Sequence, residues 1–436
     1  EISDALKANV TLAYGDYDKL YQNLYASGYA QALNPDFVTL DGYVDTTQRQ
    51  RLTLSGNLVG EFQTGGIGHT LIAGAEYLDT SNDNDRFNTR WSTNGFTDDN
   101  EIFAINRPLD LSGGMGTGFN NFVDPLTGII SGGGEPTTNN FFADGALNDR
   151  NESSVEVFSV FVQDQIEVSP NLDIVLGARF DSFDQSTTNL FDPTAPVTTD
   201  RTDEEISPRL GVIYKPQENI SIYASYSEAF LPRSGEQFAS TGSLDPDEYE
   251  QAEIGLKWDF QPGLSFTAAY FQNDQTRADR DDVTGEDFEI RGLEVEGFEL
   301  QLQGQITDQF FVTAGYSYLE GETDNGAELP RELPENTFSI WGAYDVTEKF
   351  GIGLGATYQD ESFITDFDIG STGPHPTLPS YTRVDAAAYY DISDDMRIQL
   401  NVENLLDETY FPTSHSTHQA TVGAPLNAKV TLSGRF

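Results

Sequence analysis

Two segments near the end of the chain decide the fold: "MRIQLNVE" (396–403) and "NAKVTLSGRF" (427–436). In both segments apolar or small residues occupy the even positions and polar residues the odd positions, so an extended backbone has one apolar and one polar face. Alternation with a period of two is typical of a β-strand that is apolar on one side only. The sequence therefore predicts two strands here, joined by the connection 404–426.

The same alternation recurs upstream, in residues 220–230, 264–271, 310–318 and 350–358. The segment 292–306 changes phase around Gly297, which predicts a β-bulge there. Neighbouring strands are joined by short turns at 64–68, 169–171, 216–219, 261–263, 307–309, 347–349 and 393–395. These turns alternate with long polar connections, of which the longest runs from about Arg86 to Arg150. This pattern predicts about sixteen strands, with both chain ends on the short-turn side.

Sorting of the connections into a short end and a long end is the layout of a transmembrane antiparallel β-barrel. In such a barrel the apolar face contacts lipid and the polar face lines the interior, which explains a hydrophobic content of only 37%. We predict an all-β, closed barrel in which even-numbered residues from about 158 onward face lipid, apart from the segment before Gly297. Acidic residues should then lie in the long loops and on the inner wall, because a charge facing mid-membrane lipid costs about 2–4 kcal/mol.

The composition limits the classes of function. The 436 residues include 71 acidic and 23 basic ones, a formal charge of −48 that argues against nucleic-acid binding. No apolar run reaches the roughly 18 residues of a spanning helix, and the segment "EISDALKANV" (1–10) has no signal-peptide pattern. No stretch has the composition of a linker, so we treat residues 1–436 as one barrel unit.

Five blocks carry a family resemblance: residues 207–238, 244–260, 291–318, 378–392 and 400–411. Together they resemble the C-terminal part of TonB-dependent outer-membrane siderophore receptors. The resemblance covers roughly residues 150–436, and residues 1–149 only by their strand texture. The regions "SYSEAFLPRSGEQF" (225–238) and "TSHSTHQATVGAP" (413–425) look most like the branch that takes up ferric catecholates.

The resemblance implies a 22-stranded barrel closed by an N-terminal plug, in the outer membrane of a Gram-negative bacterium among lipid and lipopolysaccharide. Such a receptor binds a ferric siderophore from outside and is opened by the periplasmic energy-coupling protein TonB. The sixteen strands would be the last sixteen, with the plug and the first strands outside this chain. A terminal aromatic residue, here Phe436, is the assembly signal of such barrels. The chain departs from the branch at Val422, where Pro is usual, and at Leu426, where Arg is usual.

Aromatic and basic residues of the long loops are the candidates for ligand contact. Aromatic rings stack well on a planar ligand group, and basic side chains suit an anionic ferric complex. The candidate ligand-binding residues are Trp91, Phe96, Phe230, Arg233, Phe238, Arg331, Phe363, Phe367 and Phe411.

Resident cofactors are not expected, since the ferric siderophore is the transported ligand. His375, His415 and His418 are weak candidates for metal ligands, and the acidic segment 279–289 is a candidate loop site for a divalent cation. No catalytic site is predicted. The paired acids Glu204 and Glu205 fall in a polar connection.

The sequence leaves three functions open. The first is TonB-dependent uptake of a ferric siderophore. The second is a passive sixteen-stranded porin, which the five blocks oppose, as does the lack of an evident arginine ladder across the interior. The third is an outer-membrane enzyme or adhesin, for which the sequence assembles no site.

Overall fold

A computed structural model gives the arrangement of the chain. It describes residues 3, 5–29, 37–91, 101–104, 117–119, 122–123, 130–131, 136–138, 145–232, 246–280, 287–322, 328–364, 367–368, 375–416 and 419–435. Among the described residues no helix is long and apolar enough to cross a membrane.

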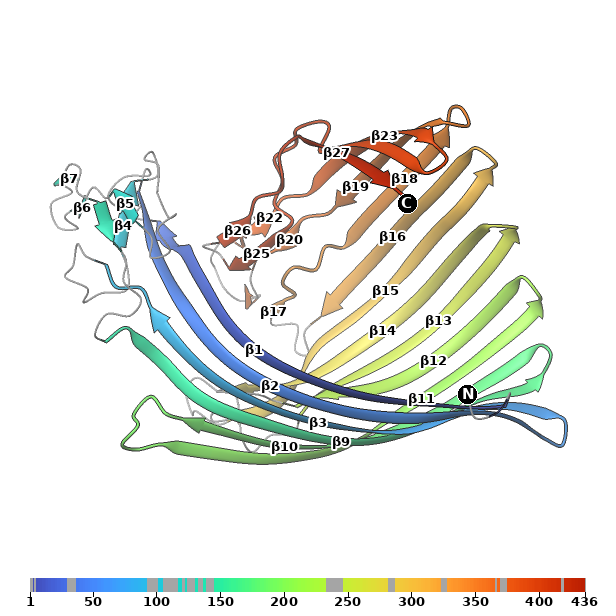
Figure 1. Ribbon diagram of the computed structural model, residues 1–436, viewed down its shortest axis with the longest axis horizontal. Coiled ribbons are helices and arrows are strands. Elements are labelled where there is room, and N and C mark those ends of the chain that lie inside the picture. Colours follow the sequence, from blue (N-terminus) through green and yellow to red (C-terminus); the bar gives the residue numbers. More distant parts are fainter. Residues whose placement is uncertain are drawn as a thin grey trace.

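One large antiparallel sheet forms the molecule, with sixteen strands hydrogen-bonded in sequence order (Figure 1). These strands are β1 (Leu6–Tyr29), β2 (Phe37–Thr64), β3 (Ile67–Asn88), β9 (Leu147–Ser169), β10 (Leu172–Asn189), β11 (Val197–Gln217), β12 (Ile220–Leu231), β13 (Asp247–Gln261), β14 (Leu264–Arg280), β15 (Asp287–Thr307), β16 (Phe310–Glu322), β18 (Asn336–Asp345), β19 (Phe350–Gln359), β23 (Tyr381–Ser393), β24 (Met396–Glu403) and β27 (Asn427–Gly434).

The long connections carry short strands of their own. These are β4 (Glu101–Ala104), which adds to β2, and β5 (Thr117–Phe119), β6 (Phe122–Val123), β7 (Ile130–Ser131), β8 (Pro136–Thr138), β17 (Glu328–Leu329), β20 (Ser362–Phe363), β21 (Phe367–Asp368), β22 (Thr377–Leu378), β25 (Thr413–Ser416) and β26 (Gln419–Thr421). At the other end the turns are tight. The turn between β2 and β3, for example, uses Gly65 and Gly66 at φ angles of 59° and 91°, the left-handed backbone that two-residue hairpins require.

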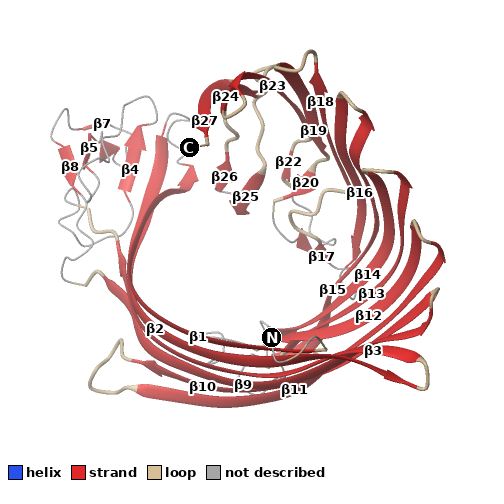
Figure 2. Ribbon diagram, turned by 45° about the vertical axis from the view of Figure 1, so that its right-hand side comes forward, coloured by secondary structure: helices blue, strands red, loops and turns tan. Residues whose placement is uncertain are grey.

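The sheet curls, so that it has a concave and a convex face (Figure 2). Glu76 of β3 and Arg179 of β10 are separated by β9, yet their side chains meet at 2.7 Å. Side chains converge in this way on the concave side of a curved sheet, so this face lines the interior.

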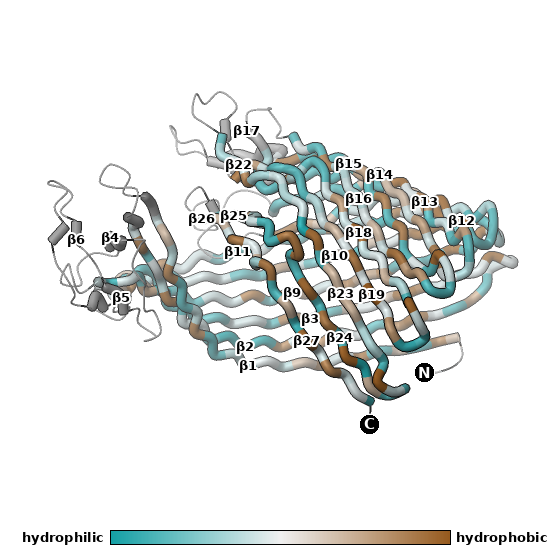
Figure 3. The backbone as a smooth tube through the Cα atoms, turned by 90° about the horizontal axis from the view of Figure 1, so that it is seen from above, coloured by the Kyte–Doolittle hydropathy of each residue, from teal (hydrophilic) through white to brown (hydrophobic). Residues whose placement is uncertain are grey.

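The opposite face carries the apolar residues that the sequence predicts. Ile398, Leu400, Val430 and Leu432 are 39%, 40%, 65% and 62% exposed, and Ile398 lies directly opposite Leu432 on the neighbouring strand. Apolar and polar residues alternate along the strands in Figure 3. The predicted even-numbered outward face is therefore confirmed for these strands.

The bulge in β15 lies at a different residue from the predicted one. The register between β14 and β15 shifts at Gly292, because Gln275 faces Leu293 and Thr276 faces Arg291. At Gly297 the register is continuous, and a Cβ atom there would clash with the backbone oxygen of Tyr318. Gly297 thus permits close approach of β15 and β16, and the predicted bulge at this residue is wrong.

The predicted closure is also wrong for the described strands. β1 pairs only with β2, and β27 pairs only with β24, so the sheet keeps two free edges. The two most exposed large apolar side chains among the described residues, Val10 at 78% and Leu12 at 70%, lie on the edge strand β1. Closure requires strand number, tilt and stagger to agree, and these sixteen strands form an arc instead.

Several strands extend far beyond the apolar band. β2 has 28 residues, whereas about 9–11 residues are enough to span a membrane. Consequently Glu204 and Glu205 lie in β11, although the sequence places them in a polar connection. Phe230, a ligand-contact candidate at the end of the predicted strand 220–230, lies in β12.

Charges on the outward face are nearly absent from the apolar band but frequent beyond it. Asp164 is an outward carboxylate within the band, and it contacts Nδ1 of His69 at 2.7 Å. Towards the long connections, five neighbouring strands place acids directly opposite one another. This acidic row consists of Glu228, Glu250, Asp274, Glu294 and Glu322. The acidic excess therefore also occupies the outward face, which the sequence analysis does not predict.

Candidate ligand-binding site

Three long connections form one assembly at the end of the sheet where ligand contact is predicted. The short strands β20, β22, β25 and β26 lie within the curve of the sheet (Figures 1 and 2). The Glu332 carboxylate accepts hydrogen bonds from the backbone nitrogen of Ser414 at 2.7 Å and from its hydroxyl at 3.3 Å. The backbone nitrogen of Glu332 donates to the carbonyl of Phe363 at 2.9 Å. Glu332 thus joins residues from three different connections.

Asn404 fixes the start of the last long connection. It is fully buried and has a φ of 53°. Its side chain donates to the carbonyls of Glu408 and Ala424, at 2.8 and 3.0 Å, and accepts from the backbone nitrogen of Glu408 at 2.9 Å. The Asn404 side chain thus ties the two ends of the 404–426 loop together. Its positive φ is tolerated because small polar residues such as Asn adopt the left-handed conformation readily.

Tyr410, in the same loop, contacts side chains on the inner face of β23. Its ring lies 4.7 Å from that of Tyr381, centroid to centroid, and its hydroxyl accepts a hydrogen bond from Arg383 at 3.2 Å. Arg383 also pairs with Asp385 at 2.9 Å. These contacts hold the base of the 404–426 loop, at Asn404 and Tyr410, against β23 and so support the outer residues of the loop.

The predicted aromatic contacts lie in different environments. Trp91 is fully buried against Leu40, with Leu24 and Ala26 beside them, so its ring anchors the loop and has no exposed surface for a ligand. Phe230 packs edge-on against Phe183 at 5.4 Å.

Phe363 and Phe411 are both half-buried, and the ring of Phe363 lies 6.4 Å from His375. Arg331 is exposed, 4.0 Å from the Glu332 carboxylate, and forms a backbone bridge to Phe363. The structure therefore brings Arg331 and Phe363 together.

Several candidates cannot be placed. Only the backbone of Phe367 is described, in β21. The other candidates outside the described residues are Phe96, Arg233, Phe238, His418, Phe436 and most of the acidic segment 279–289.

A metal site is not found in the described part of the chain. His375 and His415 are described, but no group of three or more His, Asp or Glu residues there could hold a metal ion. The weak metal candidates therefore gain no support from this geometry.

A cavity of about 400 Å³ opens between the extended ends of β16 and β19. β18 begins only at Asn336, whereas β16 continues to Glu322 beside it, so a notch forms above the start of β18. Glu335, Asp360 and Ser362 line the notch. Sequence reasoning missed these residues, because the notch depends on unequal strand lengths.

The inner wall holds a second cavity, of about 550 Å³, which Arg209, Lys215 and Lys257 line. Lys215 pairs with the buried Asp173 at 2.6 Å, and Lys257 lies over the ring of Tyr223 at 5.4 Å. Two carboxylates, those of Asp173 and Glu253, also line this cavity, so basic residues outnumber acidic ones there by one.

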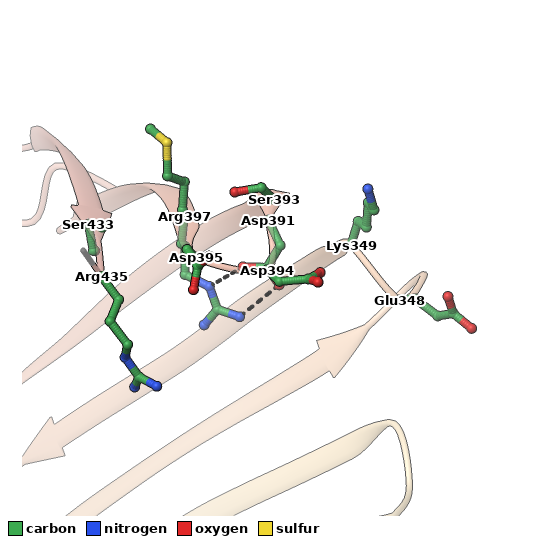
Figure 4. A pocket seen from close by; sticks show the side chains of 11 residues that line it. Glu348, Lys349, Asp391, Ser393, Asp394, Asp395, Arg397, Ser433 and Arg435 are labelled. Carbon is green, nitrogen blue, oxygen red and sulfur yellow. Dashed lines mark hydrogen bonds and ion pairs between the residues drawn. The ribbon is translucent and has the colours of Figure 1, made fainter.

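A third cavity, of about 590 Å³, lies at the short-turn end next to β27 (Figure 4). Arg397 binds both carboxylate oxygens of Asp391, at 2.7 and 2.9 Å, and Lys349 and Arg435 lie nearby. The cavity is far along the strands from the loop assembly, so it is no part of that candidate site.

Known proteins show the same architecture. The family described as TonB dependent receptor-like, beta-barrel, matches residues 2–405. The probable TonB-dependent siderophore receptor PiuA of Acinetobacter baumannii is 30% identical over 414 residues, covering 87% of this chain and 52% of that protein. The catecholate siderophore receptor Fiu of Escherichia coli K12 is 26% identical, covering 88% of this chain and 51% of that protein. The crystal structure of PiuA has a TM-score of 0.80 at 24% identity, covering 100% of this chain and 62% of that one.

The chain belongs to the TonB-dependent receptor family and contains β-barrel sequence of that family. The family resemblance seen in the sequence is therefore confirmed. The family is one of transporters rather than enzymes, and it is found in the outer membrane of Gram-negative bacteria, with short turns in the periplasm and long loops outside. The chain spans about half the length of the curated relatives it matches.

Proposed function

We propose that the complete protein takes up a ferric siderophore, of catecholate type, across the outer membrane. The family match supports a TonB-dependent receptor, and the names of PiuA and Fiu support a siderophore and a catecholate respectively. The proposal includes a periplasmic partner, TonB, acting through an N-terminal plug, and a barrel of which this chain supplies the last sixteen strands. Phe436 would serve as the assembly signal in a membrane that contains lipopolysaccharide.

One observation carries the proposal at the level of the site. Loops from three connections are hydrogen-bonded into one assembly at the outer mouth, through Glu332, Ser414 and Phe363. A large ligand needs such converging loops, because an aromatic or basic side chain must be held in place to bind at low entropic cost. Phe363 and Arg331 are the described candidates for that contact, with Phe230 and Phe411 near the ends of other loops.

The alternative is a passive sixteen-stranded porin. The two free edges of the sheet disfavour it, because a sixteen-stranded porin closes between its first and last strands.

The test compares cells with and without the full-length gene under iron limitation, each supplied with one purified ferric siderophore. Gene-dependent growth on a ferric catecholate, lost when TonB is absent, is the expected result. Growth that is independent of the gene, together with free permeation of small sugars through the purified protein in liposomes, would instead establish the porin.

A second arm tests the loop site. Phe363→Ala and Arg331→Gln should each lower uptake without lowering the amount of folded protein. Phe191→Ala, at an exposed ring in the β10–β11 loop, is the control and should leave uptake unchanged.

A further inference from the structure

The notch above β18 combines an acidic rim with an apolar floor. Five carboxylates line the cavity of about 400 Å³: Glu320, Glu322, Glu335, Asp360 and Glu361. Among the described residues that line it there is no lysine or arginine. The electrostatic potential of this cavity therefore favours a cation strongly.

A buried hydroxyl in the same cavity has no hydrogen-bond partner among the described residues. Ser362 is 4% exposed, and its Oγ makes no hydrogen bond to any described group. A buried hydroxyl without a partner costs on the order of 1–3 kcal/mol, so a hydrogen-bonding group supplied by a ligand would recover that energy. This observation is independent of the carboxylates, and it points to a donor or acceptor inside the cavity.

The spacing of the carboxylates determines which kind of cation can bind in the notch. The acids belong to the end of β16, to the loop before β18 and to the segment after β19, and no three of the described ones converge as metal ligands do. A bare metal ion would therefore lack a coordination shell here. An organic cation, whose N–H groups point in several directions, can reach separate carboxylates.

Apolar side chains complete the cavity. Leu319, Pro330 and Leu333 line it, together with the Phe363 ring, which can contact a cation through its face. Methylene groups attached to the cation would be removed from water against these side chains, at about 25 cal/mol per Å².

We propose that the notch above β18 is a binding site for an aliphatic primary ammonium group. The ammonium donates to the Ser362 hydroxyl and to carboxylates of the rim, and its alkyl chain packs on Leu319 and Leu333. Hydrogen bonds from Tyr358 and Asn336 lower the pKa of Asp360, which favours its ionised form. The use of this site in transport rests on the proposed function: the ferric ligand would carry a free amino group.

Binding is measured by calorimetry on the full-length protein purified in detergent. The probe is n-pentylammonium, and n-pentanol and pentanoate are its neutral and anionic controls. We expect binding of the ammonium alone. Equal binding of n-pentanol would overturn the proposal, because the site would then be merely apolar.

Matched variants separate the local site from the overall charge. The double variant Glu335→Gln/Glu361→Gln should lower the association constant at least about fivefold, as expected for lost charged hydrogen bonds. Glu218→Gln/Asp308→Asn removes the same charge from two short turns and should leave binding unchanged. An equal loss in both double variants would show general attraction by the acidic chain and would refute the site.

Ser362→Ala tests the hydroxyl directly. It should weaken ammonium binding while the protein keeps its heat-modifiable migration on gels, which reports a folded barrel. Unchanged ammonium binding in Ser362→Ala would show that the hydroxyl does not contact the ammonium, which would contradict the proposed geometry. Siderophore-dependent growth is scored separately, so a failure of the uptake proposal is distinguishable from a failure of ammonium binding.

Discussion

Asn404 shows how much structure one buried polar residue can fix. Its side-chain amide hydrogen-bonds backbone groups at both ends of a loop, at Glu408 and Ala424, so both its nitrogen and its oxygen have partners. Buried groups left without partners cost more than the bonds contribute when formed, so the loop base should tolerate little change.

Asn404→Ala should therefore destabilise the protein by about 1–3 kcal/mol. The measurement is the free energy of unfolding in urea, with the protein reconstituted in lipid vesicles. Asn9→Ala, at an exposed site where the side chain donates a hydrogen bond to Asn57, is the control and should change stability by less than about 0.5 kcal/mol.

Gly297→Ala tests the close approach of β15 and β16. The added methyl group would meet the Tyr318 backbone oxygen, which cannot move without disturbing the ladder, so we expect a loss of about 1–3 kcal/mol. At Gly315 the nearest atom to a new Cβ is the Ser339 hydroxyl at 3.5 Å, and Gly315→Ala should be nearly neutral. Equal effects in the two variants would contradict the steric explanation.

Asp360 makes a pH-dependent contribution of known sign. Its folded pKa is lowered, so its contribution to stability is present above the unfolded value of about 4 and is lost as the pH falls through the folded value. The difference in unfolding free energy between wild type and Asp360→Asn should accordingly shrink as the pH falls below 4. A difference that is constant with pH would disprove the coupling.

The acidic row of β12 to β16 is the most unusual feature at the level of strands. Carboxylates directly opposite one another on neighbouring strands repel, and one buried oxygen of Asp274 has no hydrogen-bond partner in the described part of the chain. Stability at these strand ends is therefore below what uncharged residues would give.

Asp274→Asn should raise the free energy of unfolding by about 0.2–1 kcal/mol, and the gain should shrink at high salt. Asp203→Asn is the opposite case, since the buried Asp203 carboxylate pairs with the half-buried Arg201 at 2.7 Å. It should destabilise the protein. A stabilising effect of both substitutions would point to the overall charge as the cause.

The strands within the apolar band could be predicted from the sequence, because lipid on one side imposes strict alternation there. Beyond the band both faces contact water, so the alternation ends although the strand continues. That is why the sequence pattern predicts a polar connection at Glu204 and Glu205, which lie in β11. The candidate site could be predicted only in part, since the contact between Glu332 and Ser414 joins residues 82 positions apart. No local pattern encodes such a pairing.

At the scale of the whole molecule, the two edge strands of the arc, β1 and β27, each leave one row of backbone N–H and C=O groups without a neighbouring described strand. Unpaired strand edges associate readily. We expect the 1–436 chain, refolded alone in detergent, to form dimers or larger species through β1 and β27, as judged by analytical ultracentrifugation. The full-length protein is the control and should be monomeric. A strictly monomeric 1–436 chain would show that its edges are protected.

The overlong strands also determine how the cell surface presents this protein. On β2, outward residues are apolar as far as Leu52, and the strand then continues to Phe37, roughly 50 Å further at about 3.3 Å per residue. Side chains at one height on this wall come from segments that are distant in sequence. Antibodies raised against intact cells should therefore recognise conformational epitopes that span neighbouring strands, and antisera against linear peptides from the same strands should bind only denatured protein.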